Sequence, residues 1–194
     1  AVNTLENLPD NELKQSLGSM LKDPILSVRT EAARVLSRLP SRAFTPEEKK
    51  HFDIAFRELK ARFLSNLDRP EANLSLGNLA ENQGNPREAE RYYKAAIERE
   101  ETFVPARMNL ATLLNRRGRN REAEKLLRQV VRLEPDWGQG HYSLGLLLAE
   151  DRNRLDEAAQ RLSRAASIMP PAEVFRCQQI LGQGWGWRWG SGRR

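Results

Sequence analysis

The same short pattern of residues occurs three times between residues 69 and 170, at intervals of 34 or 35 residues. Each copy begins with Leu followed by Gly or Ala, and continues to a small residue and then to a large one four positions later. A period of this length is typical of stacked helical hairpins, because a single hairpin cannot bury its own apolar face. The matching residues are Leu76-Gly77, Leu110-Ala111 and Leu144-Gly145; Ala89, Ala123 and Ala158; Tyr93, Leu127 and Leu162; and Ala96, Val130 and Ala165.

With Gly84 and Gly118 in the turns and Pro135 and Pro170 closing two of the units, the pattern resembles the tetratricopeptide repeat. The resemblance implies an all-α fold, a right-handed α-solenoid of helix–turn–helix repeats over residues 69–170. The three units cover 69–103, 104–137 and 138–170. One extra residue is accommodated in the turn 151–154, where an insertion is easily tolerated. The chain departs from the family where a large aromatic residue is usual, and has Asn73, Arg107 and His141 there.

The small residues of the pattern also have a physical reason. Gly77, Ala111 and Gly145 recur where two helices are expected to cross closely, and the matching alanines lie on the second helix of each unit. Asn85-Pro86 followed by Glu88 predicts a helix that begins with an N-cap, a proline in its first turn and an early acidic residue.

Residues 1–68 carry no copy of the repeat. The run from Asp23-Pro24 to Leu36, with Val28-Arg29 and Ala32-Ala33, resembles the second helix of a HEAT repeat. Thr45-Pro46-Glu47-Glu48 is a capping box that predicts a long helix through about Leu67. Because 68 residues are marginal for a separate core, we expect this HEAT-like helical cap to stack onto the first repeat.

The order of these parts is similar to the C-terminal region of some bacterial multihaem cytochrome-like proteins. The resemblance rests on the HEAT-like run, the helix that begins at Thr45-Pro46, the entry Arg69-Pro70-Glu71-Ala72, and the three repeats. It implies an exported bacterial parent protein, and so favours the periplasm over the cytoplasm. The single cysteine leaves no Cys-x-x-Cys-His motif, so no haem is attached here through that motif.

Residues 171–181 can form one further amphipathic helix, which would cover the apolar face of the last repeat. The segment 182–194 is rich in Gly, Trp and Arg, and glycine disfavours helix, so we expect a disordered tail. Arg188 among three tryptophans can stack on nucleic-acid bases or lie at a membrane interface. An irregular terminus or a cloning scar is the alternative that we favour.

For the function, the resemblance to tetratricopeptide repeats implies that the first helix of each unit lines a concave groove. Amides and hydroxyls at these positions can bind the backbone of an extended peptide of any sequence, and Leu74, Met108 and Tyr142 would form a neighbouring apolar strip. A solvated face with no ligand is the alternative. The predicted groove residues are Leu74, Asn78, Asn82, Met108, Asn109, Thr112, Asn115, Arg116, Gln139, Tyr142, Ser143 and Leu146.

Some members of that family hold the C-terminal carboxylate of a chaperone with a basic set of residues. Asn78 and Asn109 match two members of the set, but Leu74, Gln139 and Ser143 occupy its cationic positions. A carboxylate clamp requires cations or several converging donors, so we do not expect this function here.

The chain has a formal net charge of +6, and its basic residues are mostly arginines. Arginine suits bidentate contacts with phosphate, so a basic solenoid that binds an anionic polymer such as nucleic acid is an alternative function. Most of these arginines have Glu or Asp within three or four residues, the pattern of a solvated helix face, so we do not expect nucleic-acid binding.

No motif for catalysis is present. His51, His141 and Cys177 are isolated from any nucleophile–base partner that spacing would bring together, and no phosphate loop or metal-binding motif occurs. We therefore expect no enzymatic activity, no cofactor, no metal and no membrane span, and a protein or peptide as the partner. A third possibility is a structural spacer within a larger protein.

Overall fold

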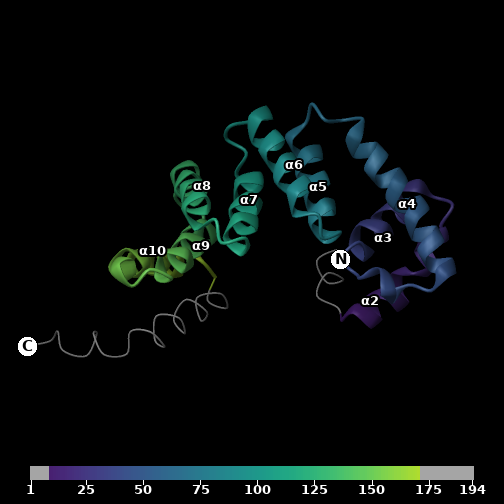
Figure 1. Ribbon diagram of the computed structural model, residues 1–194, viewed down its shortest axis with the longest axis horizontal. Coiled ribbons are helices and arrows are strands. Elements are labelled where there is room, and N and C mark those ends of the chain that lie inside the picture. Colours follow the sequence, from purple (N-terminus) through teal and green to yellow (C-terminus); the bar gives the residue numbers. More distant parts are fainter. Residues whose placement is uncertain (1–8, 171–194) are drawn as a thin grey trace, which may run out of the picture. The chain divides into compact units, whose positions relative to one another are not determined.

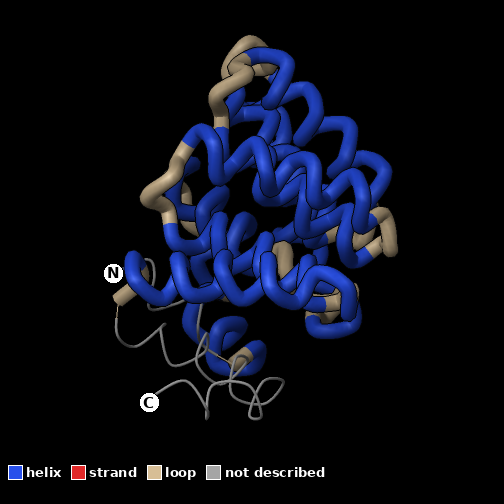
Figure 2. The backbone as a smooth tube through the Cα atoms, turned by 90° about the vertical axis from the view of Figure 1, so that its left-hand side faces the viewer, coloured by secondary structure: helices blue, strands red, loops and turns tan. Residues whose placement is uncertain are grey.

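The computed structural model describes residues 9–170, and all the regular structure in that range is helical (Figures 1 and 2). The chain divides into two compact units, Ala1–Glu101 and Thr102–Arg194, and each is described in turn. The predicted helix at 171–181 and the tail at 182–194 lie outside the described residues. None of the helices within residues 9–170 combines the length and the apolar character needed to cross a bilayer.

In the first unit, three α-helices and two short 3₁₀ helices precede the repeats within the described residues. The capping box predicted at Thr45 is confirmed: Thr45 Oγ1 accepts from Glu48 N at 3.3 Å, and Thr45 N donates to Glu48 Oε2 at 2.7 Å. The helix that it opens ends at Leu64, three residues before the predicted end, since the side chains of Ser65 and Asn66 donate to the Arg62 carbonyl. The elements are α2 (Asp10–Leu17), η1 (Ser19–Lys22), α3 (Leu26–Leu36), η2 (Ser41–Ala43) and α4 (Pro46–Leu64).

One apolar core joins these helices to the first repeat. Leu79 of α5 (Pro70–Asn82) is buried in the same cluster as residues of α2, α3 and α4. Lys60 on α4 forms an ion pair with Glu88 on α6 (Pro86–Arg99), at 3.2 Å. The N-terminal helices and the first repeat therefore stabilise one another. The core residues are Leu13, Leu17, Leu21, Ala32, Ala33, Val35, Leu36, Leu39, Phe52, Ala55, Phe56, Leu59 and Leu79.

The turn between α5 and α6 closes one helix and opens the next. Gly84 has φ +70°, its N–H donates to the Glu81 carbonyl at 2.9 Å, and Asn85 N donates to the Ala80 carbonyl at 2.8 Å. These two bonds form a Schellman motif, which terminates a helix through a left-handed residue. Asn85 then caps α6 as predicted, because its side chain accepts from Glu88 N.

Residues 102–170 of the second unit form two helical hairpins. The turn of the first hairpin repeats the Schellman motif with Gly118 at φ +72°, 34 residues after Gly84. In the second hairpin the predicted insertion forms a short 3₁₀ turn, in which Asp151 Oδ1 accepts from Asn153 N at 3.0 Å. The elements are α7 (Val104–Arg116), α8 (Asn120–Leu133), α9 (Gly138–Ala149), η3 (Arg152–Arg154) and α10 (Leu155–Ile168).

Close packing at the small residues is confirmed within the hairpins. A Cβ atom on Gly77 would overlap the ring of Tyr93 on the paired helix, and one on Gly145 would lie 2.7 Å from Leu162 Cγ. Ala89, at the matching position of the paired helix α6, is fully buried. The two helices of a hairpin therefore approach more closely than larger side chains would allow.

Candidate functional site

On α5, the predicted groove residues share the outward side of the helix. Leu74 is half-buried and Asn78 and Asn82 are exposed, at intervals of four residues, whereas Leu76 and Leu79 between them are buried. This alternation is the 3.6-residue period of an amphipathic helix, so the three predicted residues lie on one surface, the α5 face.

The exposed Asn78 is held by a buried tyrosine. Tyr93 Oη lies 2.8 Å from the Asn78 side-chain oxygen and 2.7 Å from Glu81 Oε2, and its side chain is fully buried. A phenol has one proton, so it can donate to only one of these acceptors. Donation to the Glu81 carboxylate, with the Asn78 amide turned to donate to Tyr93 Oη, satisfies all three groups. The contact fixes the orientation of Asn78.

At the end of the same face, Asn82 contacts a residue far away in the sequence. Asn82 Nδ2 donates to Ser37 Oγ at 2.8 Å, across 45 residues. Ser37 is buried and its hydroxyl donates to the Arg34 carbonyl at 2.7 Å. The α5 face is thus continuous with the N-terminal helices of the same unit.

On α7, four of the five predicted residues lie outward. Asn109 and Asn115 are half-buried and Thr112 and Arg116 are exposed. Met108 is 9% exposed, so it belongs to the packed side of the helix and offers little apolar surface to a ligand. The repeat pattern did not predict this difference. Met108 and Asn109 are adjacent on the helix, at the boundary between its packed side and its outward side.

On α9, all four predicted residues are accessible. Gln139 is exposed, and Tyr142, Ser143 and Leu146 are half-buried, at helical spacing. Gln139 Nε2 lies 3.5 Å from Ser143 Oγ. Within residues 9–170 the Tyr142 hydroxyl makes no hydrogen bond. A half-buried phenol with an unused hydroxyl is suited to bind an apolar group and a hydrogen-bonding group together.

Glu150 joins α7 to the end of α9. Its carboxylate accepts from Asn115 Nδ2 at 3.4 Å and from Asn120 Nδ2 at 2.6 Å, and Asn115 Nδ2 also lies 3.2 Å from Asn120 Oδ1. The C-terminal ends of α7 and α9 are therefore neighbours within the second unit. We call the outward residues Asn109, Thr112, Asn115, Gln139, Tyr142, Ser143 and Leu146 the α7–α9 face.

Three polar residues that replace the usual aromatic are buried in equivalent positions. Asn73 donates to the Leu67 carbonyl at 2.8 Å and to the Arg69 carbonyl at 2.9 Å, and His141 Nε2 lies 2.9 Å from the Pro135 carbonyl. The bonds from Asn73 to Leu67 and from His141 to Pro135 both span six residues. Each therefore ties the segment before a repeat to the first helix of that repeat, a structural role that the sequence did not reveal.

Arg107, the middle member of the three, uses a different partner. Its Nε donates to Gln129 Oε1 at 3.2 Å, which connects α7 to α8.

The hydrogen bond of His141 defines its tautomer. Nε2 must carry the proton, because a carbonyl only accepts. The buried Nδ1 of His141 has no hydrogen-bond partner within residues 9–170.

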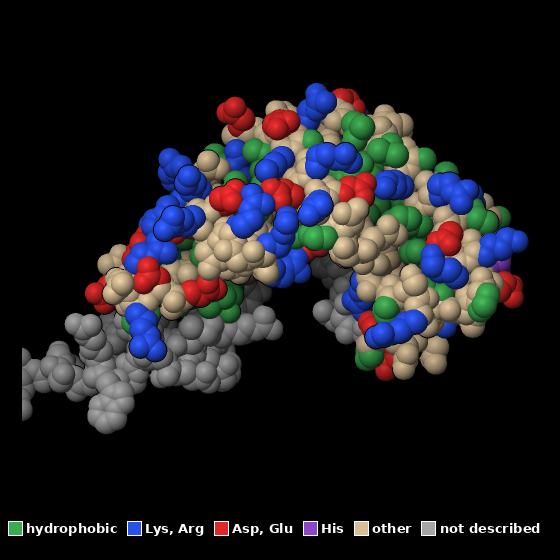
Figure 3. Space-filling view, in the orientation of Figure 1, with side chains coloured by type: hydrophobic (Ala, Val, Ile, Leu, Met, Phe, Trp, Pro, Cys, Tyr) green, Lys and Arg blue, Asp and Glu red, His purple; other side chains and the backbone are tan. Residues whose placement is uncertain are grey.

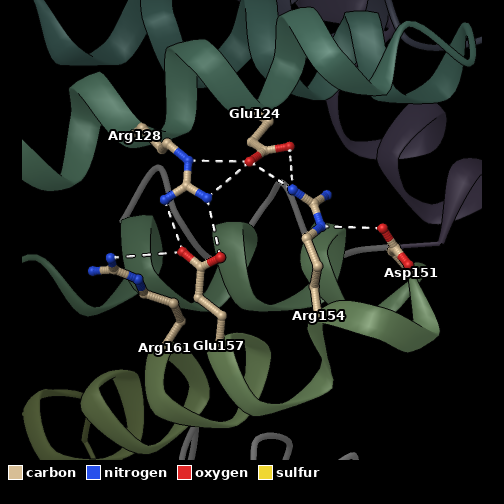
Figure 4. A network of polar contacts seen from close by, with 6 residues as sticks. All are labelled: Glu124, Arg128, Asp151, Arg154, Glu157 and Arg161. Carbon is tan, nitrogen blue, oxygen red and sulfur yellow. Dashed lines mark hydrogen bonds and ion pairs between the residues drawn. The ribbon is translucent and has the colours of Figure 1, made fainter.

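A network of charged side chains connects α8 to the last hairpin (Figure 4). Arg154 Nη1 lies 2.8 Å from both oxygens of Glu124, and Arg128 contacts Glu124 at 2.9 Å and Glu157 at 2.7 Å. Burial disfavours the charge on Glu124, but hydrogen bonds from Arg154 and Arg128 outweigh burial, and the pKa of Glu124 lies below its ordinary value. The hydrogen bond from Arg128 likewise lowers the pKa of Glu157.

Many of the arginines that suggested an anionic ligand form ion pairs with Asp or Glu side chains. Positive and negative side chains are interspersed over the face that Figure 3 shows. Such pairing leaves less positive potential for a phosphate backbone than the net charge alone suggests. The arginines of the second unit that contact Asp or Glu include Arg119, Arg128, Arg154, Arg161 and Arg164.

The residues considered for catalysis are not brought together. His51 lies 3.9 Å from Glu47, one turn earlier on α4, and His141 is buried in the second unit. Cys177 lies outside the described residues. Within residues 9–170 no three His, Cys, Asp or Glu side chains are grouped as metal ligands would be.

Comparison with known proteins agrees with the repeat pattern. Residues 80–147 match the model of the tetratricopeptide repeat family. A search of curated proteins found no match. All the regular structure of residues 9–170 is helical, as in an α-solenoid of helical repeats, and the match to the family model lies in the central part of the chain.

Two solved structures illustrate the likeness of the fold. The crystal structure of MamA has a TM-score of 0.58 and 20% sequence identity, and the match covers 74% of this chain and 86% of that one. The structure of YrrB, described as a TPR protein with an unusual peptide-binding site, has a TM-score of 0.55 and 20% identity, and covers 92% of this chain and 94% of that one.

Proposed function

We propose that this protein is a protein–protein interaction module that binds an extended segment of its partner on the outward faces of the first helices of its repeats. The observation that carries the proposal is the α7–α9 face. There Tyr142, whose hydroxyl makes no hydrogen bond within residues 9–170, is adjacent to Ser143 and one turn from Leu146, on helices that Glu150 joins. The peptide-binding site of YrrB, a protein of similar fold, supports this choice.

The chemistry of the face suits a peptide backbone. Amide and hydroxyl groups both donate and accept, so Asn109 and Ser143 suit backbone N–H and C=O groups without demanding a particular sequence. Thr112 donates to the Met108 carbonyl at 3.0 Å, so its oxygen suits a backbone N–H. Tyr142 and Leu146 supply apolar area for one or two side chains of the peptide. We expect affinity to come from the backbone and preference to come from these two residues.

The α5 face is the corresponding surface of the first unit. Leu74 is its apolar element, and Asn78 and Asn82 are held in place by Tyr93 and Ser37. Because an oriented amide loses less entropy on binding than a mobile one, these contacts favour ligand binding at this face.

The test is selection of extended peptides from a random displayed library on the full chain, followed by calorimetry on the selected peptides. Tyr142→Ala is expected to weaken binding about tenfold or more, which corresponds to about 1.4 kcal/mol. Lys125→Ala, an exposed change on α8, is the matched control and should leave binding unchanged. Equal affinities for wild type and Tyr142→Ala would contradict the proposal for this face.

The same experiment separates the alternatives. An anionic polymer would bind with an affinity that falls steeply as salt is raised, whereas backbone-dominated peptide binding changes little with salt. Failure to select any peptide would favour the spacer role instead. The HEAT-like nature of residues 1–68, the boundaries of the repeats, and an exported parent protein of the multihaem cytochrome type remain predictions.

A further inference from the structure

A separate cavity of about 330 Å³ lies within the first unit, where the end of α3, the start of α4 and the end of α5 meet. This volume falls in the range of small-ligand pockets. Its polar lining comes from residues that are remote in the sequence and that neither the repeat pattern nor the family match includes in one site: Ser37, Ser41, Lys49, Asn82 and Gln83.

Several polar groups of the cavity have unused hydrogen-bonding capacity. Asn82 gives its amide N–H to Ser37, while no bond within residues 9–170 uses its side-chain oxygen. The side chains of Ser41 and Gln83 also make no hydrogen bond within that range. Donors and acceptors that converge on a cavity without partners of their own are what a polar ligand requires.

Lys49 supplies the only charge among the residues that line the cavity. Its ammonium group pairs with Asp53, one turn further along α4, and lies 5.3 Å from the centre of the Phe52 ring. An exposed pair of this kind contributes little free energy, so the cation can accept a second carboxylate at small cost. Lys49 is therefore the residue of the lining that can contact an anionic group.

One wall of the cavity is aromatic. The rings of Phe44 and Phe52 are stacked, with centroids 5.0 Å apart and planes inclined by 26°. A flat aromatic wall beside a cation suits a short aliphatic stem that ends in a carboxylate, because the stem packs on the rings while the oxygens reach Lys49 and the amides.

We propose that this cavity binds the side-chain carboxylate of a Glu or Asp residue in a peptide whose neighbouring residues lie on the α5 face. Asn82 belongs to both surfaces, so the peptide can pass from one to the other within the same unit. The inference rests on the proposed function in one respect only, which is that a peptide carries the carboxylate.

The test uses nuclear magnetic resonance titration of the ¹⁵N-labelled full chain with capped glutamate, N-acetyl-glutamate methylamide, and with the glutamine analogue. Capped glutamate is expected to shift amide signals of residues 37–52 and 82–83 and to bind about tenfold more tightly than the glutamine analogue. Lys49→Met keeps the aliphatic stem on Phe52 and should remove that preference. Lys50→Met, the adjacent exposed lysine, is the matched control and should retain it.

A second variant keeps the test informative if Lys49→Met does not fold. Gln83→Ala, at an exposed position after α5, should lower the affinity for capped glutamate severalfold without affecting the helices. Equal binding of the two probes, shifts elsewhere in the protein, or an unchanged preference in Lys49→Met would each overturn the proposal.

Peptides distinguish the source of the carboxylate. An alanine-based peptide with one central glutamate should bind at least as tightly as capped glutamate and should also shift signals of Leu74 and Asn78. If capped glutamate binds and the peptide does not, a free carboxylate is the ligand and the peptide source is wrong. Neither result depends on Tyr142, so failure here and failure of the proposed function at the α7–α9 face are distinguishable.

Discussion

The ring of Tyr93 fills the space in which a methyl group on Gly77 would lie. Tyr93 is fully buried, and its hydroxyl contacts the side chains of Asn78 and Glu81 on α5. One side chain therefore sets both the distance between α5 and α6 and the orientation of polar groups on the α5 face.

Gly77→Ala is expected to lower the free energy of unfolding of the first unit by about 1–3 kcal/mol, the usual cost of overpacking a core. The cost arises although alanine favours helix over glycine, because the ring of Tyr93 cannot move without breaking its hydrogen bonds. Urea unfolding followed by far-ultraviolet circular dichroism measures the difference.

The second repeat provides the control, since it has Ala111 and Leu127 where the first has Gly77 and Tyr93. The double change Gly77→Ala/Tyr93→Leu should recover part of the loss, which a double-mutant cycle reports as a favourable coupling. Equal stability of Gly77→Ala and the wild type would contradict the close approach of the two helices.

The repeat spacing was sufficient to predict this crossing, because a small residue recurs at each of the three sites. It was not sufficient to predict the bonds of the Tyr93 hydroxyl. Those bonds depend on side-chain rotamers and on which outward residues lie above the ring, and periodicity specifies only the face of a helix.

The stability of the first unit is expected to depend on pH through Glu48. The hydrogen bond from Lys14, followed by the one from the Thr45 backbone, lowers the pKa of Glu48 from 4.5 to about 2. A carboxylate with a lowered folded-state pKa stabilises fully above its unfolded pKa, and loses that contribution as pH falls through the folded value. The contribution should therefore be complete above about pH 4.5 and disappear near pH 2.

Glu48→Gln isolates the charge, since glutamine also serves in a capping box. Urea titration at several pH values measures the difference in unfolding free energy between wild type and Glu48→Gln. This difference should decrease as the pH falls from about 4.5 to about 2. A Glu48→Gln difference that is constant with pH would count against the ion pair.

Glu124→Gln is expected to destabilise the second unit by about 1–2 kcal/mol, because it removes the charge on which four hydrogen bonds from Arg128 and Arg154 depend. Glu122→Gln on the same helix is the control, because the pair of Glu122 with Arg119 is an exposed pair across one turn, and such pairs contribute little. Thermal unfolding with and without high salt measures both, and comparable losses in the two variants would show that the network adds nothing.

Asn73→Ala is expected to cost about 1–3 kcal/mol, since it removes the two hydrogen bonds from the Asn73 side chain to the Leu67 and Arg69 carbonyls. Asn73→His should recover part of this loss, because His141 makes the equivalent bond six residues back in the third repeat. Hydrogen exchange at the start of α5 is the measurement; unchanged protection in Asn73→Ala would show that the bond has no structural role.

For the candidate site, the sequence predicted which residues lie outward on α5 and α9, because exposed and buried positions alternate with the helical period. It could not predict that Met108 is buried, since a boundary position one step from the outward side can pack either way. The sequence could not predict the cavity either, because Ser37, Lys49 and Asn82 belong to segments that meet only when the N-terminal helices pack on the first repeat.

The turns at Gly84 and Gly118 have a consequence for chemical synthesis. A Cβ atom at either position would meet nothing within 4 Å, and the backbone there is left-handed. A side chain therefore fits at both positions, but the left-handed backbone is unfavourable for an L-amino acid. A mirror-image residue such as D-alanine prefers that backbone, so a semisynthetic chain carrying it at both turns should be more stable than the natural one, by restricting the unfolded chain alone.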